Sequence, residues 1–475
     1  MVRKASYDQE INLTPWLKDV KNIRFLLPAL EFNLYSPTTN KEDPKVATSK
    51  ATEQTTARHS WRFLDKFLQL RAFAAFRYRE CALILYGQIF VSMGMWMDEV
   101  TRSWLIYELT NSAVQLGLVR GVQAIPYLLL SPVAGSVADR YSRKVQMVVA
   151  QVLNGLVYGA TALLIFTGQI QPWHVYVTAV LTAVSQAFQQ PARTSMIADT
   201  VPPAYLTNAI GLNAMFNNLC RAIGPALAGM LIAKFGTGGT YSVQAVFYFL
   251  ATIWTVQLHP ARPSSESSYG HSAHKESFGQ SVIEGWKFSW RNEAVRTGLL
   301  TVMFVSLFIV PFRTLLPVFA RDLLGVGATG QGLLVTAMGI GGLFSAVLIA
   351  SAGEKLPRGM FMLGSVMLYG FTLVIFAISP WFQLSMVMMG IAGLCHVHSY
   401  ILVQTVIQSY SPSDIRGRTF AIFDMSHVVT MAGSILVGML SSLLGARWAV
   451  ASMSAVGSLT MIMIYVALPR ARHIR

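Results

Sequence analysis

The stretch GSVADRYSRK, residues 135–144, places four charged side chains between two long apolar runs of the sequence. Residues 113–134 precede it and residues 145–166 follow it, and each run is long enough to cross a hydrocarbon core of about 30 Å as a helix. A short charged connection between two such helices is typical of a loop at a membrane surface. The stretch therefore predicts a helical hairpin in a membrane, with its charges outside the hydrocarbon.

The same pattern continues through the chain. Of its 475 residues, 53% are hydrophobic and 12% are charged, which is too apolar for an ordinary water-soluble protein. Twelve apolar windows are predicted to span the membrane, at residues 82–107, 113–134, 145–166, 173–190, 208–233, 240–258, 296–319, 330–352, 359–379, 382–406, 419–444 and 447–468. Because the two-residue alternation of a membrane β-barrel is missing, we predict an all-α membrane protein.

The net charge of +15 follows the predicted loops and not a single patch. Basic residues gather in every second connection and in the C-terminal tail: Arg140, Arg143, Lys144, Arg193, Arg262, Lys275, Lys287, Arg291, Lys355, Arg358, Arg416, Arg418, Arg470, Arg472 and Arg475. The other connections contribute little more than Lys234, Arg321 and Arg447. The positive-inside rule therefore predicts that both termini are cytoplasmic and that the protein lies in the plasma (inner) membrane. This distribution of basic residues also argues against nucleic-acid binding.

Two hydrophilic segments divide the chain. Residues 1–75 are predicted to be a cytoplasmic extension, partly disordered because its middle has few apolar residues, with flanks that either lie on anionic lipid or stay unstructured. Residues 259–294 are predicted to be a cytoplasmic linker with an interfacial helix. The remaining parts are a six-helix bundle over 76–258, a second over 295–469 and a basic cytoplasmic tail over 470–475.

The two halves contain a trace of internal duplication. IFTGQIQPWHV precedes the fourth predicted span and IFAISPWFQL precedes the tenth, so that Trp173 and Trp381 lie 208 positions apart. After these spans, Pro202 and Pro412 lie 210 positions apart. A parallel duplication places two pseudo-symmetric bundles around an axis along the membrane normal, with a cavity between them at mid-depth. Rocking of the bundles then exposes the cavity to either side in turn.

The charged loop resembles the signature of the major facilitator superfamily, G-x-x-x-D-R-x-G-R-K/R. The matching residues are Gly135, Asp139, Arg140, Arg143 and Lys144, and Ser142 replaces the second glycine. The resemblance implies the major facilitator fold, with twelve transmembrane helices, and implies that Asp139 stabilises the outward-facing arrangement through the start of the eleventh span. From the residues alone, the three basic side chains are expected at the lipid phosphates. The charge cluster either latches the two bundles together in one state and releases them in the other, or is a plain positive-inside loop.

The fifth span contains a second match. CRAIGPALAG, residues 220–229, is similar to the antiporter signature G-x-x-x-G-P-x-x-G-G at Gly224, Pro225 and Gly229, and differs from it at Cys220 and Ala228. Glycine and proline in a span bend the helix and admit a close neighbour. Stretches such as QQPARTSMIADTVP and LLPVFARDLLGVGATGQGLL resemble the branch that holds macrolide effluxers and the enterobactin exporter, over about residues 77–468.

The first span contains ionisable residues in WMDEVTRSW. Asp98 and Glu99 each share a helix face with Arg102, and Arg120 of the second span is expected at the same depth. A charge inside the membrane costs at least about 2.5–3.5 kcal/mol, so each needs a partner, a wet cavity or a function. One hypothesis is that a carboxylate, with Asp98 preferred, takes up and releases a proton during transport. The alternative is permanent pairing with Arg102 and Arg120.

Further ionisable residues occur in later spans. Arg221 and Arg313 have no acid nearby in the sequence, and they either face the cavity and select anionic or carbonyl-rich substrates or snorkel to the surface. Asp424 and His427 lie one turn apart and are expected to titrate together or to belong to the gate.

The segment CHVHS, residues 395–399, raises the question of a metal site. Cys395 and His398 share a helix face, whereas His396 points elsewhere. Because a tetrahedral site needs further ligands, we predict no metal, and His398 is kept as a cavity candidate. Three scattered cysteines also cannot form a disulfide framework.

The predicted function is secondary active transport. The sequence contains no G-x-x-x-x-G-K-[ST] loop, which leaves an ion gradient as the energy source. The leading hypothesis is proton-coupled efflux of amphipathic small molecules, of the drug or siderophore class, by alternating access in a monomer, with protons and membrane lipids as further partners. A uniporter or lipid flippase of the same fold is the nearest alternative. A membrane sensor or scaffold that does not transport, or a metal or redox enzyme, comes after it. We expect no cofactor and no enzymatic activity.

Overall fold

The computed structural model describes residues 71–259, 278–352, 357–412 and 415–467. Residues Asp65–Arg475 form one compact unit. The predicted extension over residues 1–75 lies almost entirely outside the described residues, as do half of the linker and the whole basic tail. Throughout the described ranges the secondary structure is helical, without a strand. The expectation of an all-α fold is confirmed.

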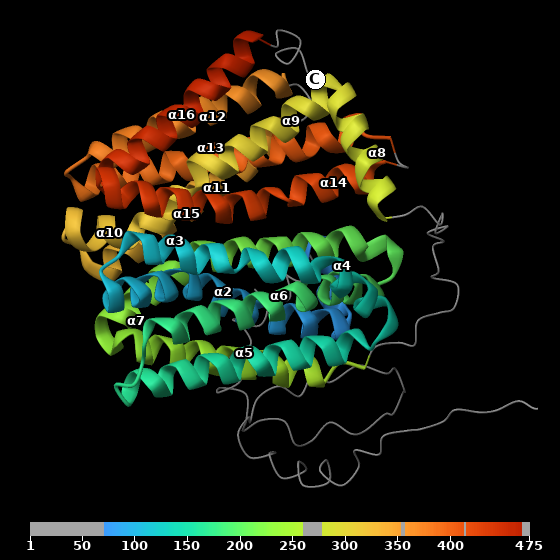
Figure 1. The fold of residues 1–475 in the computed structure, drawn as a ribbon. Coiled ribbons are helices and arrows are strands. Elements are labelled where there is room, and N and C mark those ends of the chain that lie inside the picture. The colour runs from blue at the N-terminus through green and yellow to red at the C-terminus, as the bar shows by residue number, and fades with distance from the viewer. Residues whose placement is uncertain (1–70, 260–277, 353–356, 413–414, 468–475) are drawn as a thin grey trace, which may run out of the picture. The chain divides into compact units, whose positions relative to one another are not determined.

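The helices of the first half begin with η2 (Arg71–Arg77) and α2 (Arg79–Thr110). They continue with α3 (Ala113–Val122), α4 (Ala124–Arg140), α5 (Arg143–Phe166), α6 (Pro172–Asp199), η3 (Pro203–Tyr205) and α7 (Leu206–Val256). α7 holds two predicted spans, because Gly236 adopts a left-handed φ of +69° that separates two helical arms. Figure 1 shows this half in blue to green.

The second half begins with α8 (Phe278–Arg291), α9 (Glu293–Phe304), the π-helix η4 (Val305–Ile309), the 3-10 helix η5 (Val310–Leu315), α10 (Leu316–Val318) and the π-helix η6 (Phe319–Leu323). It ends with α11 (Gly327–Ala352), α12 (Arg358–Ile378), α13 (Phe382–Tyr410), α14 (Arg416–Asp424), α15 (Ser426–Leu444) and α16 (Ala446–Ala467). In Figure 1 these helices, coloured yellow to red, form a second group beside the first.

Among the described residues, ten helical segments are long and apolar enough to cross a membrane. One of them contains the whole of α7 and so covers two predicted spans. α6 occupies the position of the fourth predicted span but is not among the ten. The multi-pass character is thus established, and the number twelve stays a prediction.

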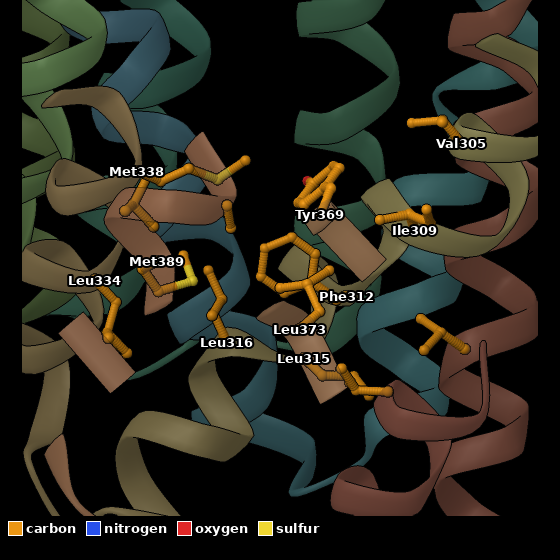
Figure 2. Close-up of a cluster of buried hydrophobic side chains, with 14 of the residues drawn as sticks. Val305, Ile309, Phe312, Leu315, Leu316, Leu334, Met338, Tyr369, Leu373 and Met389 are labelled. Atoms are coloured by element: carbon orange, nitrogen blue, oxygen red, sulfur yellow. The ribbon is translucent and has the colours of Figure 1, made fainter. Parts of the chain in front are cut away.

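The seventh span departs from the regular helix that its apolar sequence predicts. Pro311 lacks an N–H and its ring excludes a carbonyl one turn earlier, so the regular ladder is interrupted where η4 passes into η5. Irregular backbone at membrane depth is tolerated where protein or a wet cavity surrounds it. Here Phe312 is buried edge-on against Tyr369 of α12, at 6.4 Å between ring centroids, within the apolar cluster of Figure 2.

The interior of each half depends on close helix contacts. α11 and α13 meet at small residues, and a Cβ added to Gly393 would lie 1.9 Å from the carbonyl oxygen of Met338. No larger residue fits at such a crossing. Cys81, Cys220 and Cys395 are buried free thiols, as expected of packing residues.

We define two ends of this helical unit. The basic end holds the connection at residues 141–142, the connection at 200–205 and helix α8. The opposite end holds the start of α3, the end of α15 and the connection between η6 and α11. At the basic end, α8 packs on α14 through an ion pair between Glu284 and Arg418.

Candidate functional site

A cavity of about 1780 Å³ lies between the two halves. Its walls come from α2, α3, α4, α6 and α7 on one side and from α9, η4, η5, α11, α13, α14 and α15 on the other. The lining reaches Gly417 and Arg418 at the start of α14, where α8 packs, so the cavity extends from mid-depth to the basic end. Its volume exceeds the 300–1,000 Å³ that is common for drug-sized ligands.

Toward the opposite end the two halves are packed together. α3 runs beside α15 (Figure 1), and a Cβ added to Gly117 would lie 2.4 Å from the carbonyl oxygen of Ser434. α7 meets α11 equally closely, because a Cβ on Gly332 would lie 2.4 Å from the carbonyl oxygen of Pro225. Backbone contact of this kind leaves no passage between these helices.

A polar cluster joins the halves at the same end. Tyr107 donates a hydrogen bond to the Asp322 carboxylate, and Arg321 lies 4.2 Å above the ring of Tyr107. Arg321 also donates to Asn111 Oδ1 at 2.5 Å and pairs with Asp322 at 2.9 Å. We call Tyr107, Asn111, Arg321 and Asp322 the polar latch. Since α2 supplies Tyr107 and η6 supplies both charged residues, the latch holds this end closed.

Asp98 and Arg102 form a buried ion pair inside the first half. The side chains of Asp98 and Arg102 are 8% and 7% exposed, and both line the cavity. Arg102 also donates to Thr182 Oγ1 of α6 at 2.8 Å. Among the described residues, Asp98 Oδ1 has no hydrogen-bond partner. One turn of α2 thus brings acid and base together, as the i, i+4 spacing predicts.

Glu99 points between the halves and has two partners. Its Oε1 lies 2.8 Å from Arg120 Nη2 of α3 and 2.9 Å from Arg313 Nη2 of η5. The sequence predicts the first contact, because α2 and α3 form an antiparallel hairpin. It does not predict the second, because 214 positions separate Glu99 from Arg313. The interruption of the seventh span places Phe312 in the core and Arg313 in the cavity wall.

Arg221 of α7 also lines the cavity. Its guanidinium lies 5.1 Å from the ring of Trp96, which in turn donates to Asn217 Oδ1 at 3.0 Å. No acid in the described ranges lies within ion-pair distance of Arg221. Neither Arg221 nor Arg313 snorkels, since both face the cavity.

Three cavity candidates remain, and two of them line the cavity. Asp424 and His427 both line the cavity near its basic end, where Met425 separates α14 from α15. The expectation that His398 faces the cavity is wrong. His398 packs against Ser345 and Phe361, and its neighbour His396 lines the cavity instead, because residues two apart in a helix point to different sides. The described residues contain no group of three metal-ligating side chains.

The gate motif lies at the basic end. Gly135, Asp139 and Arg140 belong to the last turns of α4, and their side chains are outside the described part of the structure. Arg143 pairs with Asp199 at the end of α6, and Lys144 donates to the carbonyl of Leu258 at 2.6 Å. Arg143 and Lys144 therefore have protein acceptors, and their position at the level of the lipid phosphates stays a prediction.

The antiporter-like motif contributes to helix packing. A Cβ on Gly224 would lie 2.9 Å from Cβ of Trp96, and one on Gly229 would lie 2.6 Å from the carbonyl oxygen of Ala328. Pro225 is accommodated inside α7 without ending it. The motif therefore allows α7 to approach α2 and α11, and its small residues hold Trp96 and Arg221 at the cavity wall.

Sequence reasoning missed several partners. Asp199 stands in the quoted stretch QQPARTSMIADTVP, but only the fold brings it to Arg143. Tyr107 and Asp322 lie 215 positions apart and give no local signal. The sequence favours His398 over His396 as a cavity residue without a decisive signal, because periodicity alone does not say which face of a fully apolar helix meets the cavity.

Comparison with known proteins agrees with this architecture. The sequence model of the transmembrane secretion effector family matches residues 70–474. The chain is 23% identical to the staphyloferrin A transporter of Staphylococcus aureus, covering 74% of this chain and 87% of that protein. It is 26% identical to the multidrug efflux pump Tap of Mycobacterium tuberculosis (76% and 87% covered), and 21% identical to macrolide efflux protein A of Streptococcus pyogenes (78% and 90% covered).

Solved structures show the same fold. A bacterial homologue of the human lysosomal transporter Spinster, in an inward-facing and unoccupied conformation, matches with a TM-score of 0.61 and 16% identity, covering 85% of this chain and 97% of that one. The nucleoside transporter NupG matches with a TM-score of 0.62 and 12% identity, covering 81% and 99%. These families consist of membrane transporters and not enzymes. The chain is therefore a multi-pass membrane protein of the transmembrane secretion effector family, in the drug and siderophore exporter branch of the major facilitator superfamily.

Proposed function

We propose that this protein exports amphipathic small molecules in exchange for protons, by alternating access of the cavity between its halves. The observation that carries the proposal is the set of acid–base pairs in the cavity wall, the buried pair of Asp98 with Arg102 and the partly exposed group of Glu99 with Arg120 and Arg313. Buried charges at membrane depth are costly and mark ion or substrate pathways. The relatives named as efflux pumps support the direction.

The cavity walls suit an amphipathic cargo. Apolar side chains such as Val302, Val305 and Leu343 alternate with polar ones such as Gln186 and Asn217. An apolar surface with a few polar groups binds molecules that have one lipophilic and one polar face. A lipid flippase would need a lateral route to the bilayer, and no observation favours one.

The energy source we propose is the proton gradient. Each elementary charge that moves through 100 mV releases about 2.3 kcal/mol, and a tenfold concentration ratio costs about 1.4 kcal/mol. One proton therefore sustains a substrate gradient above tenfold. Asp98 is the proposed proton carrier, since it is buried beside the cavity and one of its oxygens has no partner among the described residues.

The proposed cycle uses both ends of the unit. If the positive-inside rule holds, the basic end is cytoplasmic, both termini are cytoplasmic, and the described arrangement is open toward the cytoplasm. Asp139 would then favour the outward-facing state, as the superfamily resemblance implies, and its contact with α14 would form as the basic end closes. We propose that a monomer in the plasma (inner) membrane completes this cycle.

Transport in inverted membrane vesicles tests the proposal. We expect vesicles containing the protein to accumulate an amphipathic molecule of the drug or siderophore class when respiration acidifies their interior, and to lose that accumulation with nigericin. Asp98→Asn is expected to abolish the nigericin-sensitive part, because an amide cannot carry the proton.

Glu108→Gln provides the matched control, since Glu108 lies on the same helix but does not line the cavity. It is expected to leave accumulation unchanged. If nigericin does not change uptake, or if Asp98→Asn takes up substrate at the wild-type level, the result would instead identify a uniporter.

A further inference from the structure

The cavity wall around Glu99 carries more positive than negative charge. One carboxylate there faces the guanidinium groups of Arg120 and Arg313 at hydrogen-bond distance. Arg221 of α7 lines the same cavity as a third guanidinium. Uncompensated charge in such a site is costly unless a counter-ion joins it.

The other acids of the cavity do not compensate this excess. Asp98 is committed to Arg102 on the side of the first half. Asp424 lies beside His427, close to the basic end. In the described ranges, no further acid lines the cavity.

Buried side-chain nitrogen atoms in the cavity wall also have no hydrogen-bond partner. Arg313 Nε is buried without a partner among the described residues, and so is His396 Nδ1. Arg221 has an aromatic ring as its neighbour and no carboxylate. The guanidinium fork matches the geometry of a carboxylate and binds it through two parallel hydrogen bonds.

We infer that the cargo of this cavity is an anion, an amphipathic carboxylate held by Arg221 and Arg313. This inference rests on the proposed transport function and names its substrate class. Trp96 offers an aromatic face for the lipophilic part of the molecule, next to the Arg221 guanidinium. Glu99 is an internal competitor, because its carboxylate already occupies one guanidinium of the anion site. A membrane potential that is negative inside would assist the export of such an anion.

Equilibrium binding of three matched probes tests the substrate class. The probes are 2-naphthoate, 2-naphthamide and 2-(aminomethyl)naphthalene, which share one ring system and carry negative, zero and positive charge. Calorimetry on the purified detergent-solubilised protein is expected to show that the anion binds at least about tenfold more tightly than either counterpart. Equal affinities, tighter binding of the amine, or no binding of the anion at millimolar concentration would overturn the inference.

Substitutions of the two arginines then test where the anion binds. Arg221→Gln is expected to lower the affinity for 2-naphthoate about tenfold or more and to leave the amide unaffected, whereas Arg221→Lys retains much of the preference. Arg313→Gln is expected to act in the same direction. Arg447→Gln, at the opposite end and outside the cavity, is the control and should change nothing. Arg221 has no ion pair to lose in the described structure, so its replacement tests charge without breaking one.

Replacement of Glu99, which competes with the anion for Arg313, tests the site most directly. Glu99→Gln is expected to raise the affinity for 2-naphthoate about tenfold, because the guanidinium groups of Arg120 and Arg313 are released. Glu108→Gln, the same change outside the cavity, should have no effect. If Glu99→Gln folds by size-exclusion chromatography and binds the anion more weakly, the assignment is wrong.

These experiments separate the inference from the proposed function. Binding in detergent requires neither a gradient nor a direction of transport. Nigericin-insensitive transport with a preference for the anion would refute the proton coupling alone. Proton-coupled export with a preference for the amine would refute the anion site alone.

Discussion

Replacement of Gly393 by valine is expected to prevent the second half from folding. A Cβ at this position would lie 1.9 Å from the carbonyl oxygen of Met338 and 2.6 Å from its carbonyl carbon. Because both atoms belong to the backbone of α11, no side-chain rotation relieves the clash, and the two helices must separate. Overpacking of this kind costs about 3 kcal/mol or more, a large part of ordinary stability. Size-exclusion chromatography of a fluorescent fusion should show loss of the monodisperse peak.

Gly364→Val is the matched control. Gly364 lies in α12 with no neighbouring atom within 4 Å of an added Cβ, so the same substitution meets open space. The two variants share chemistry and helical backbone and differ in packing alone. A normal elution profile for Gly393→Val would show that α11 and α13 do not cross as closely as described.

Asp322→Ala is expected to open the end that the polar latch closes. The substitution removes the acceptor of the Tyr107 hydroxyl and the partner of Arg321, and a hydrogen bond to a charged group contributes about 1.5–3 kcal/mol. Partial exposure reduces this figure, so we expect a net change of about 1–2 kcal/mol, or a five- to thirtyfold shift toward the state open at this end.

Thiol labelling measures the shift. In a background without Cys81, Cys220 and Cys395, a Thr314→Cys probe lies in the cavity wall behind the latch. A membrane-impermeant maleimide should label it several times faster in Asp322→Ala than in the parent. Arg447→Ala, which removes a charge at the same end without touching the latch, should leave the rate unchanged. An unchanged rate in Asp322→Ala would mean that helix packing alone holds this end closed.

Local pattern predicted the parts of the site that lie close together in the chain. Asp98 pairs with Arg102 because residues four apart share a helix face. Glu99 meets Arg120 because consecutive antiparallel helices bring residues at equal depth together. Both contacts follow from helix geometry and the length of an apolar run, and neither depends on how the two halves pack.

Contacts between the halves were not predictable in this way. Arg313 reaches Glu99 from an interrupted part of the seventh span, next to Pro311, and that interruption is not visible in the hydropathy of the span. His396 faces the cavity and His398 does not, although both stand on a helix that is apolar on all sides. The partners of Arg143 and Lys144, Asp199 and the carbonyl of Leu258, also lie far from them in the sequence.

Hydropathy alone was enough to predict that this chain crosses a membrane many times as helices, because the cost of an unpaired backbone in hydrocarbon leaves long apolar segments no other structure. The residue pattern also located the charged loop, the acids inside the first span and the glycine-rich helix. The packing of the two halves decides which charges share one cavity, which end of that cavity is closed, and that guanidinium groups from both halves pair with a single carboxylate. The physical reason is that hydropathy and periodicity fix the depth and face of a residue, whereas its partner across the interface depends on the packing of two separate bundles.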